Sequence, residues 1–79
     1  MVLNKRLIKY CRFLSGYTQK ELASKAGVHD SLISKAEAGV LKLQPHTEQK
    51  LIEVFSDAGI DIQLVKQVDE MIKNDKKEV

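Results

Sequence analysis

The amino-acid sequence predicts an all-α fold, and three observations support that prediction. Apolar residues recur every three or four positions through most of the chain, which is the spacing of amphipathic helices. Thr18 and Glu21 have the spacing of a capping box, which marks the beginning of a helix. A glycine that can end a helix with a positive φ follows each of the first four periodic segments: Gly16, Gly27, Gly39 and Gly59.

These signals divide the chain into five predicted helices. In chain order they cover about residues 3–14, 18–26, 30–38, 47–58 and 64–74. In the first helix, Leu7, Cys11 and Leu14 share one face and Ile8 lies beside them, so we expect this face in the core.

Residues 60–79 carry a mixed pattern. Ile60, Ile62 and Leu64 alternate with polar residues, as in a short strand, but a longer set of apolar residues repeats at helical spacing. This apolar stripe consists of Leu64, Val65, Val68, Met71 and Ile72. We expect a helix over about residues 64–74, after a short extended stretch, and a frayed end from residue 73.

Length and composition restrict the class of protein. With 79 residues the chain can build one domain with a modest core. It has no apolar signal segment and no apolar run of membrane-spanning length, so we expect a cytoplasmic protein without a membrane partner. A single cysteine excludes an internal disulfide, and we interpret Cys11 as a buried small hydrophobe rather than a redox-sensing thiol. His29 and His46 lack metal-ligand spacing, so neither a metal nor a cofactor is expected.

Charge is unevenly distributed although the net charge is only +2. Residues 1–59 hold nine Lys and Arg against six Asp and Glu, whereas residues 60–79 hold four against five. The positive excess therefore lies in the part that would meet a nucleic acid. The chain has no glycine-rich phosphate loop and no nucleophile–base pair, so we expect no catalytic residues and no enzyme activity.

The predicted helices at 18–26 and 30–38 are separated by a short turn. Tyr17 and Leu22 stand at the two positions of a hydrophobic staple around the first of them. Ala23 is small where the two helix axes should approach most closely, and Gly27 stands where the turn needs a positive φ. Together these features indicate a helix-turn-helix.

The chain resembles the Cro/cI-type (XRE) helix-turn-helix family over about residues 7–60. The resemblance is carried by Arg12-x-x-x-Gly16-x-Thr18-Gln19-x-Glu21-Leu22-Ala23-x-x-Ala26-Gly27-Val28 and by its continuation Ile33-Ser34-Lys35-x-Glu37-x-Gly39. It implies a compact, lambda-repressor-like bundle of about five helices that binds a palindromic DNA operator as a homodimer. Residues 1–60 would form the helix-turn-helix domain, and residues 61–79 a helical tail used for dimerisation.

By position in the family motif, a group of polar residues is implied to contact double-stranded DNA: Thr18, Gln19, His29, Asp30, Ser31, Ser34, Lys35 and Lys42. Gln19 would touch a phosphate, because free N–H groups at a helix N-terminus favour an anion. Asp30, Ser31 and Lys35 would face base edges, and Lys35 could donate to guanine. Lys42 would contact the sugar–phosphate backbone of the DNA. Asp30 is atypical at a base-facing position, which leaves the operator sequence open.

Three further positions concern the scaffold. Arg12 and Glu37 match a family pair that joins the first helix to the end of the third by a structural ion pair. Ala36 stands where a larger aliphatic residue is common, so Tyr17, Phe13 or the tail would fill the core beneath the third helix.

The apolar stripe has two interpretations. It can pack back on the first and fourth helices, or it can form a two-fold interface that sets the separation of two recognition helices, which we favour. The preferred function is a sequence-specific transcriptional regulator, namely a homodimeric repressor of the phage, mobile-element or restriction-controller type. The alternative is an antitoxin or other protein-binding module whose tail binds a toxin or another protein.

Overall fold

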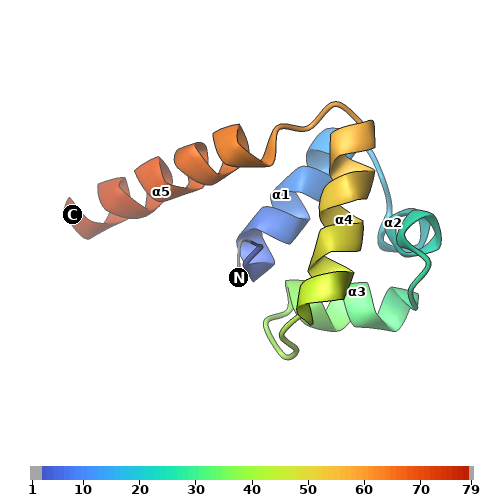
Figure 1. The fold of residues 1–79 in the computed structure, drawn as a ribbon. Coiled ribbons are helices and arrows are strands. Elements are labelled where there is room, and N and C mark those ends of the chain that lie inside the picture. Colours follow the sequence, from blue (N-terminus) through green and yellow to red (C-terminus); the bar gives the residue numbers. More distant parts are fainter. Residues whose placement is uncertain (1–2, 79) are drawn as a thin grey trace.

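The computed structural model describes the chain from residue 3 to residue 78, and the surroundings of its side chains up to residue 71. Within those residues all regular structure is helical, so the predicted all-α class is confirmed. The helices are α1 (Lys5–Ser15), α2 (Gln19–Ala26), α3 (Asp30–Glu37), α4 (Pro45–Asp57) and α5 (Ile62–Glu78). The first four form a compact group, and α5 extends away from α2 and α3 (Figure 1).

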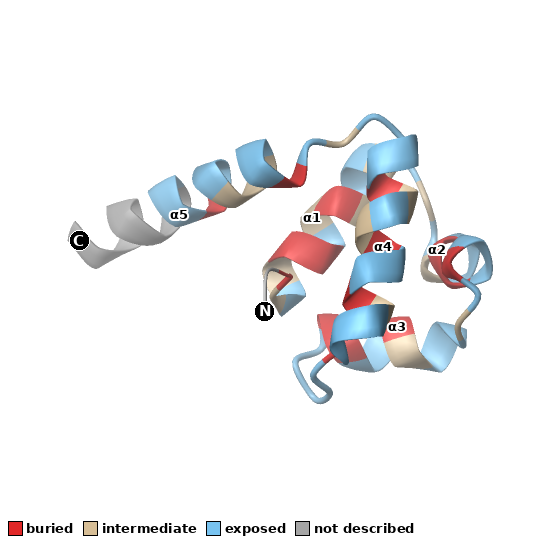
Figure 2. Cartoon of the chain, in the orientation of Figure 1, coloured by how far each residue is buried: buried red, intermediate tan, exposed pale blue. Residues whose placement is uncertain are grey.

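The core lies where α1, α2, α3 and α4 face one another (Figure 2). Its largest fully buried side chains come from all four helices and from the segment before α1: Phe55, Leu3, Leu7, Ile8, Leu22, Ile33, Leu51 and Cys11. Cys11 is buried, as expected, and burial raises the pKa of its thiol to about 11. A thiol in this state is a packing group and a poor nucleophile.

The apolar face of α1 is narrower than predicted. Leu14, which we expected on the buried face, is 66% exposed, and its neighbour Phe13 is 64% exposed. Both lie in the last turn of α1, beyond the part of the helix that the core covers. Phe13 therefore does not fill the space beneath α3, whereas Tyr17 is half-buried and packs against the core.

Local caps place two helix boundaries differently from the prediction. α1 begins at Lys5 rather than at residue 3, because Asn4 Oδ1 accepts a hydrogen bond from the Leu7 N–H at 2.9 Å. α4 begins two residues earlier than expected, because Pro45 suits the first turn, where its missing N–H is not needed. His46, just outside the helix predicted over residues 47–58, therefore lies in that first turn and is exposed.

α5 is longer than predicted at both ends. Asp61 Oδ1 accepts from the N–H groups of Gln63 at 3.0 Å and Leu64 at 3.4 Å, so the helix begins at Ile62. The alternation of Ile60, Ile62 and Leu64 does not form a strand, because Ile60 lies in the link before α5 and the other two residues lie in the first turn of the helix. The helix continues to Glu78, past the residue at which we expected fraying.

A buried polar contact holds α5 beside α1. Asp69 is 3% exposed and accepts from Arg6 Nε at 3.1 Å, from Arg6 Nη2 at 3.4 Å and from Asn4 Nδ2 at 3.5 Å. Sequence reasoning missed this contact, although a carboxylate inside an apolar stripe was a signal for it. The tail is thus anchored along α1, and the division of the chain at residue 60 stays a prediction.

Candidate nucleic-acid interface

The capping box predicted at the start of α2 is present. Thr18 Oγ1 accepts from the Glu21 N–H at 3.1 Å, and Glu21 Oε1 accepts from the Thr18 N–H at 2.9 Å. The Thr18 backbone N–H, which donates to the carboxylate, is the main reason why the pKa of the Glu21 carboxyl lies below its ordinary value, and the Thr18 side chain lowers it further. The two bonds also fix the residue at which α2 begins, and with it the position of Gln19.

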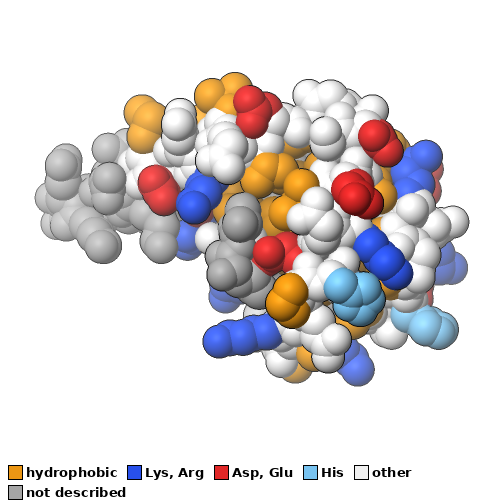
Figure 3. All heavy atoms as spheres, viewed as in Figure 1, with side chains coloured by type: hydrophobic (Ala, Val, Ile, Leu, Met, Phe, Trp, Pro, Cys, Tyr) orange, Lys and Arg blue, Asp and Glu red, His pale blue; other side chains and the backbone are white. Residues whose placement is uncertain are grey.

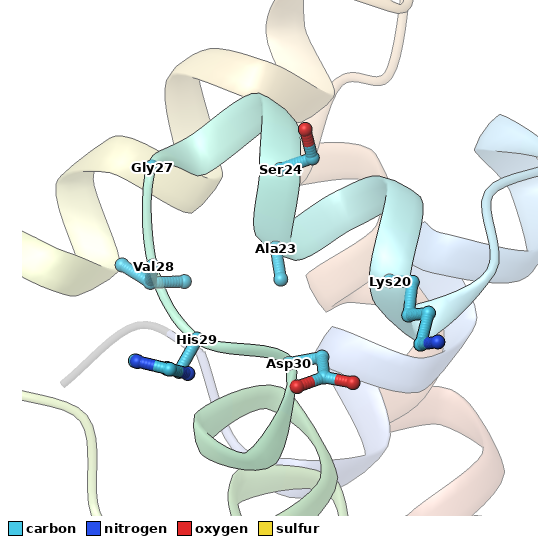
Figure 4. A pocket seen from close by; sticks show the side chains of 7 residues that line it. All are labelled: Lys20, Ala23, Ser24, Gly27, Val28, His29 and Asp30. Atoms are coloured by element: carbon cyan, nitrogen blue, oxygen red, sulfur yellow. The ribbon is translucent and has the colours of Figure 1, made fainter.

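The turn between α2 and α3 depends on one backbone conformation. Gly27 has a φ of +72°, and a Cβ there would meet no heavy atom within 4 Å, so conformation rather than space requires glycine. Ala23 is buried on the side of α2 that faces α3 (Figure 4). The two helices border a hollow of about 590 Å³ that Lys20, His29 and Asp30 also line.

α3 separates a buried face from an exposed one. Ile33, Ala36 and Glu37 are buried. The residues implied to face base edges, and the serine between them, are all exposed: Asp30, Ser31, Ser34 and Lys35. His29 precedes the helix as its N-cap, but its side chain makes no capping hydrogen bond and is exposed. The helix therefore presents a continuous polar surface to solvent.

Arg12 and Glu37 form a bidentate ion pair. Arg12 Nε donates to Glu37 Oε2 at 2.6 Å, and Nη2 donates to Oε1 at 3.0 Å. The side chains are only 11% and 3% exposed, and Arg12 Nη1 also donates to the Tyr17 carbonyl at 3.0 Å. One guanidinium thus joins α1, the α1–α2 link and the end of α3.

Gln19 takes part in the same network, which sequence reasoning did not foresee. Its Nε2 donates to Glu37 Oε1 at 3.2 Å, and this leaves the second amide hydrogen for another acceptor. Burial by itself would raise the pKa of Glu37. Hydrogen bonds from Arg12 and Gln19, together with the charges of Arg12 and Lys9, instead hold it below the ordinary 4.5. Glu37 is therefore a charged scaffold residue.

The loop after α3 is anchored at one point and exposed elsewhere. Leu43 is buried in the core, whereas Val40, Leu41 and Lys42 are exposed. Figure 3 shows Lys, Arg and His side chains along the edge of the molecule that α3 and this loop form. Lys42 is therefore exposed in the loop that directly follows α3.

The apolar stripe on α5 is only partly covered. Leu64 is 59%, Val68 47% and Met71 66% exposed, while Val65 is half-buried and packs against the core. Ile72 lies outside the residues whose side chains are described. Figure 3 shows apolar side chains on α5 at the surface of the molecule.

The end of α1 widens this apolar surface, which sequence reasoning missed. A groove of about 430 Å³ runs between α1 and α5. It is lined by Tyr10, Phe13, Leu14, Leu64, Val65 and Val68. The signal was present in the sequence as two adjacent apolar residues, Phe13 and Leu14, of which a narrow helix face could bury only one.

Comparisons with known proteins agree with the geometry. A family model described as helix-turn-helix matches residues 7–56, which is more than half of the chain and includes α2, the turn and α3. No curated protein and no solved structure matches. In the described part of the chain no His, Cys, Asp and Glu residues gather as metal ligands would. None of the described helices has the length and apolar character to cross a membrane.

Proposed function

Because the chain belongs to the Cro/cI-type (XRE) helix-turn-helix family, whose members are DNA-binding regulators, we propose that it is a sequence-specific, homodimeric transcriptional repressor. One observation carries the proposal. The exposed polar face of α3 is held in a fixed orientation by the buried Arg12–Glu37 pair. A recognition helix needs both an accessible donor and acceptor surface and a rigid attachment to its scaffold.

In this proposal α3 lies in the major groove. Lys35 donates to a guanine, Ser31 donates or accepts, and Asp30 accepts from the amino group of a cytosine. Ser34 lies on the same surface and reaches a base or a phosphate. These assignments are supported by exposure and by position on one helix face.

The remaining polar residues flank α3 and would set its register through the DNA backbone. Gln19 and Thr18 stand at the start of α2, where N–H groups favour a phosphate. His29 precedes α3, and Lys42 follows it in the loop.

The apolar stripe, with the end of α1, would form the dimer interface. Leu64, Val68 and Met71 are exposed together with Phe13 and Leu14. Covering five such side chains buries on the order of 500 Å² per protomer, or about 1,000 Å² in a dimer, which is near the lower end for a stable interface. Neighbouring polar surface would bring the total into the ordinary range.

A second function is favoured by the same exposed surface. An amphipathic helix of another protein could occupy the groove between α1 and α5, as in an antitoxin that binds its toxin and also represses its own operon. This candidate predicts that the apolar stripe stays exposed in the free dimer, whereas in the repressor the dimer interface covers the stripe.

Selection of bound sequences from a random double-stranded DNA library, combined with sedimentation of the free protein, tests the proposal. We expect an enriched palindrome with half-sites about one turn apart, roughly 34–36 Å, and a sedimenting dimer. A folded protein that enriches no sequence would contradict specific recognition. A dimer that persists in Leu64→Asp/Val68→Asp would leave the apolar stripe free and favour the protein-binding alternative.

A further inference from the structure

Two lysines on α1 lie beside the end of the recognition helix. Lys5 and Lys9 are exposed and one helical turn apart. The Cδ atom of Lys5 is 3.0 Å from the place that a Cβ on Gly39 would take, so the stem of this lysine lies over the loop that follows α3. Sequence reasoning gave neither lysine a role.

Lys9 borders a hollow on the side of α3 that faces α1. The hollow has a volume of about 360 Å³, and Gln19, Ser34 and Ala38 also line it. Besides Arg12, whose guanidinium binds Glu37, three of its side chains can donate hydrogen bonds: the ammonium of Lys9, the free amide hydrogen of Gln19 and the hydroxyl of Ser34. Their convergence favours a ligand that only accepts hydrogen bonds.

The Glu37 carboxylate also lines the hollow, but it should repel an anion there only weakly. Glu37 is neutralised by the bidentate bonds from Arg12 and accepts a third bond from Gln19. Among the described residues the ion pairs are Arg6–Asp69 and Arg12–Glu37, so neither Lys5 nor Lys9 is held in one. Lys9 is near enough to Glu37 for its charge to help lower the pKa of that carboxyl, but Arg12 already neutralises the carboxylate. Two cations outside ion pairs along one edge attract a polyanion.

We propose that Lys5 and Lys9 form a phosphate-binding edge, in which Lys9, Gln19 and Ser34 hold one backbone phosphodiester of the duplex. The inference rests on the proposed function, because α3 must lie in the groove for this edge to meet DNA. The major groove is about 12 Å wide, so structure at the side of an inserted helix meets the phosphates that border the groove. Lys5 then meets the next phosphate along the same strand, beside the loop that carries Lys42.

Binding to a random-sequence duplex at several salt concentrations tests this edge without knowledge of the operator. Each phosphate contact contributes about 0.9 to the slope of log affinity against log salt. We expect Lys9→Gln to lower that slope by about 1 per bound protomer and to weaken binding about three- to tenfold near 0.1 M salt. Lys5→Gln should act in the same direction, and Lys9→Arg should retain the slope.

The matched control is Lys66→Gln, which removes the same charge from α5, away from α3 (Figure 1). Thermal melting checks that every variant is folded. If Lys9→Gln and Lys5→Gln change the salt slope no more than Lys66→Gln does, the phosphate edge is wrong while DNA binding by α3 stands. If Lys9→Gln instead changes which sequences are preferred at an unchanged slope, the residue reads bases and the inference is also overturned. A wild-type protein that binds no duplex contradicts the proposed function itself.

Discussion

Removal of the Arg12 guanidinium should loosen α3 from α1 and weaken the whole fold. In Arg12→Met the Glu37 carboxylate, 3% exposed, loses both charged hydrogen bonds and keeps only the bond from Gln19. Breaking a buried pair on one side costs about 3–5 kcal/mol, and the 11% exposure of Arg12 admits some water, so we expect about 3 kcal/mol. For a chain of this size that corresponds to a fall in Tm of roughly 12–24 °C.

A double-mutant cycle that adds Glu37→Leu measures the interaction free energy between the Arg12 and Glu37 side chains, apart from their contacts with other residues. Replacement of both partners by apolar residues is often close to neutral, so Arg12→Met/Glu37→Leu should be more stable than either single variant, with a coupling of about 2 kcal/mol. The assay is urea unfolding followed by far-UV circular dichroism. Additive losses in the double variant would show that the two side chains do not act as a buried pair.

The contribution of Glu37 to the free energy of unfolding should depend on pH, and the lowered pKa gives the sign. The pKa of Glu37 is lowered in the folded protein, so its contribution to stability is present above the ordinary value of 4.5 and is lost as pH falls through the lower folded pKa. Urea unfolding measured above pH 4.5 and again below the folded pKa of Glu37 should show that the wild type has a smaller free energy of unfolding at the lower pH. The double variant, which lacks the carboxyl group, should lose less, and an equal loss would contradict the assignment.

Three further predictions concern the tail, the thiol and the turn. Leu64→Asp/Val68→Asp should give a folded monomer that binds operator DNA poorly, and a variant that still sediments as a dimer would refute the proposed interface. Cys11, with its pKa raised to about 11, should react with a thiol reagent only as fast as the protein unfolds; rapid labelling of the native protein would contradict its burial. Gly27→Ala should destabilise by about 1 kcal/mol through its positive φ alone, measured by urea unfolding, and an unchanged midpoint would mean that the turn does not need that conformation.

The elements that could be predicted are those that local chemistry determines. The capping box at Thr18 and the positive φ at Gly27 depend on residues close in sequence, and both are as expected. α5 was harder, because its first turn alternates apolar and polar residues like a strand. The capping carboxylate of Asp61 decides the outcome, and that contact was not considered.

Long-range polar contacts could be predicted only where a motif contains both partners. The Arg12–Glu37 pair follows from the family pattern and is present. The bond from Gln19 to Glu37 and the contact between Arg6 and Asp69 join residues with no shared local pattern, so no sequence signal specified their partners. The exposure of Leu14 was missed for a similar reason, because burial at the end of α1 depends on where α5 lies.

Selection from a random duplex library, carried out in parallel with wild type and Lys35→Ala, tests most directly whether the exposed face of α3 reads base edges. We predict that wild type enriches a palindrome and that Lys35→Ala loses preference at one symmetric pair of positions, with about 1–3 kcal/mol less discrimination there. Enrichment of the same sequences with the same preferences by both proteins would contradict the assignment of α3 as the recognition helix.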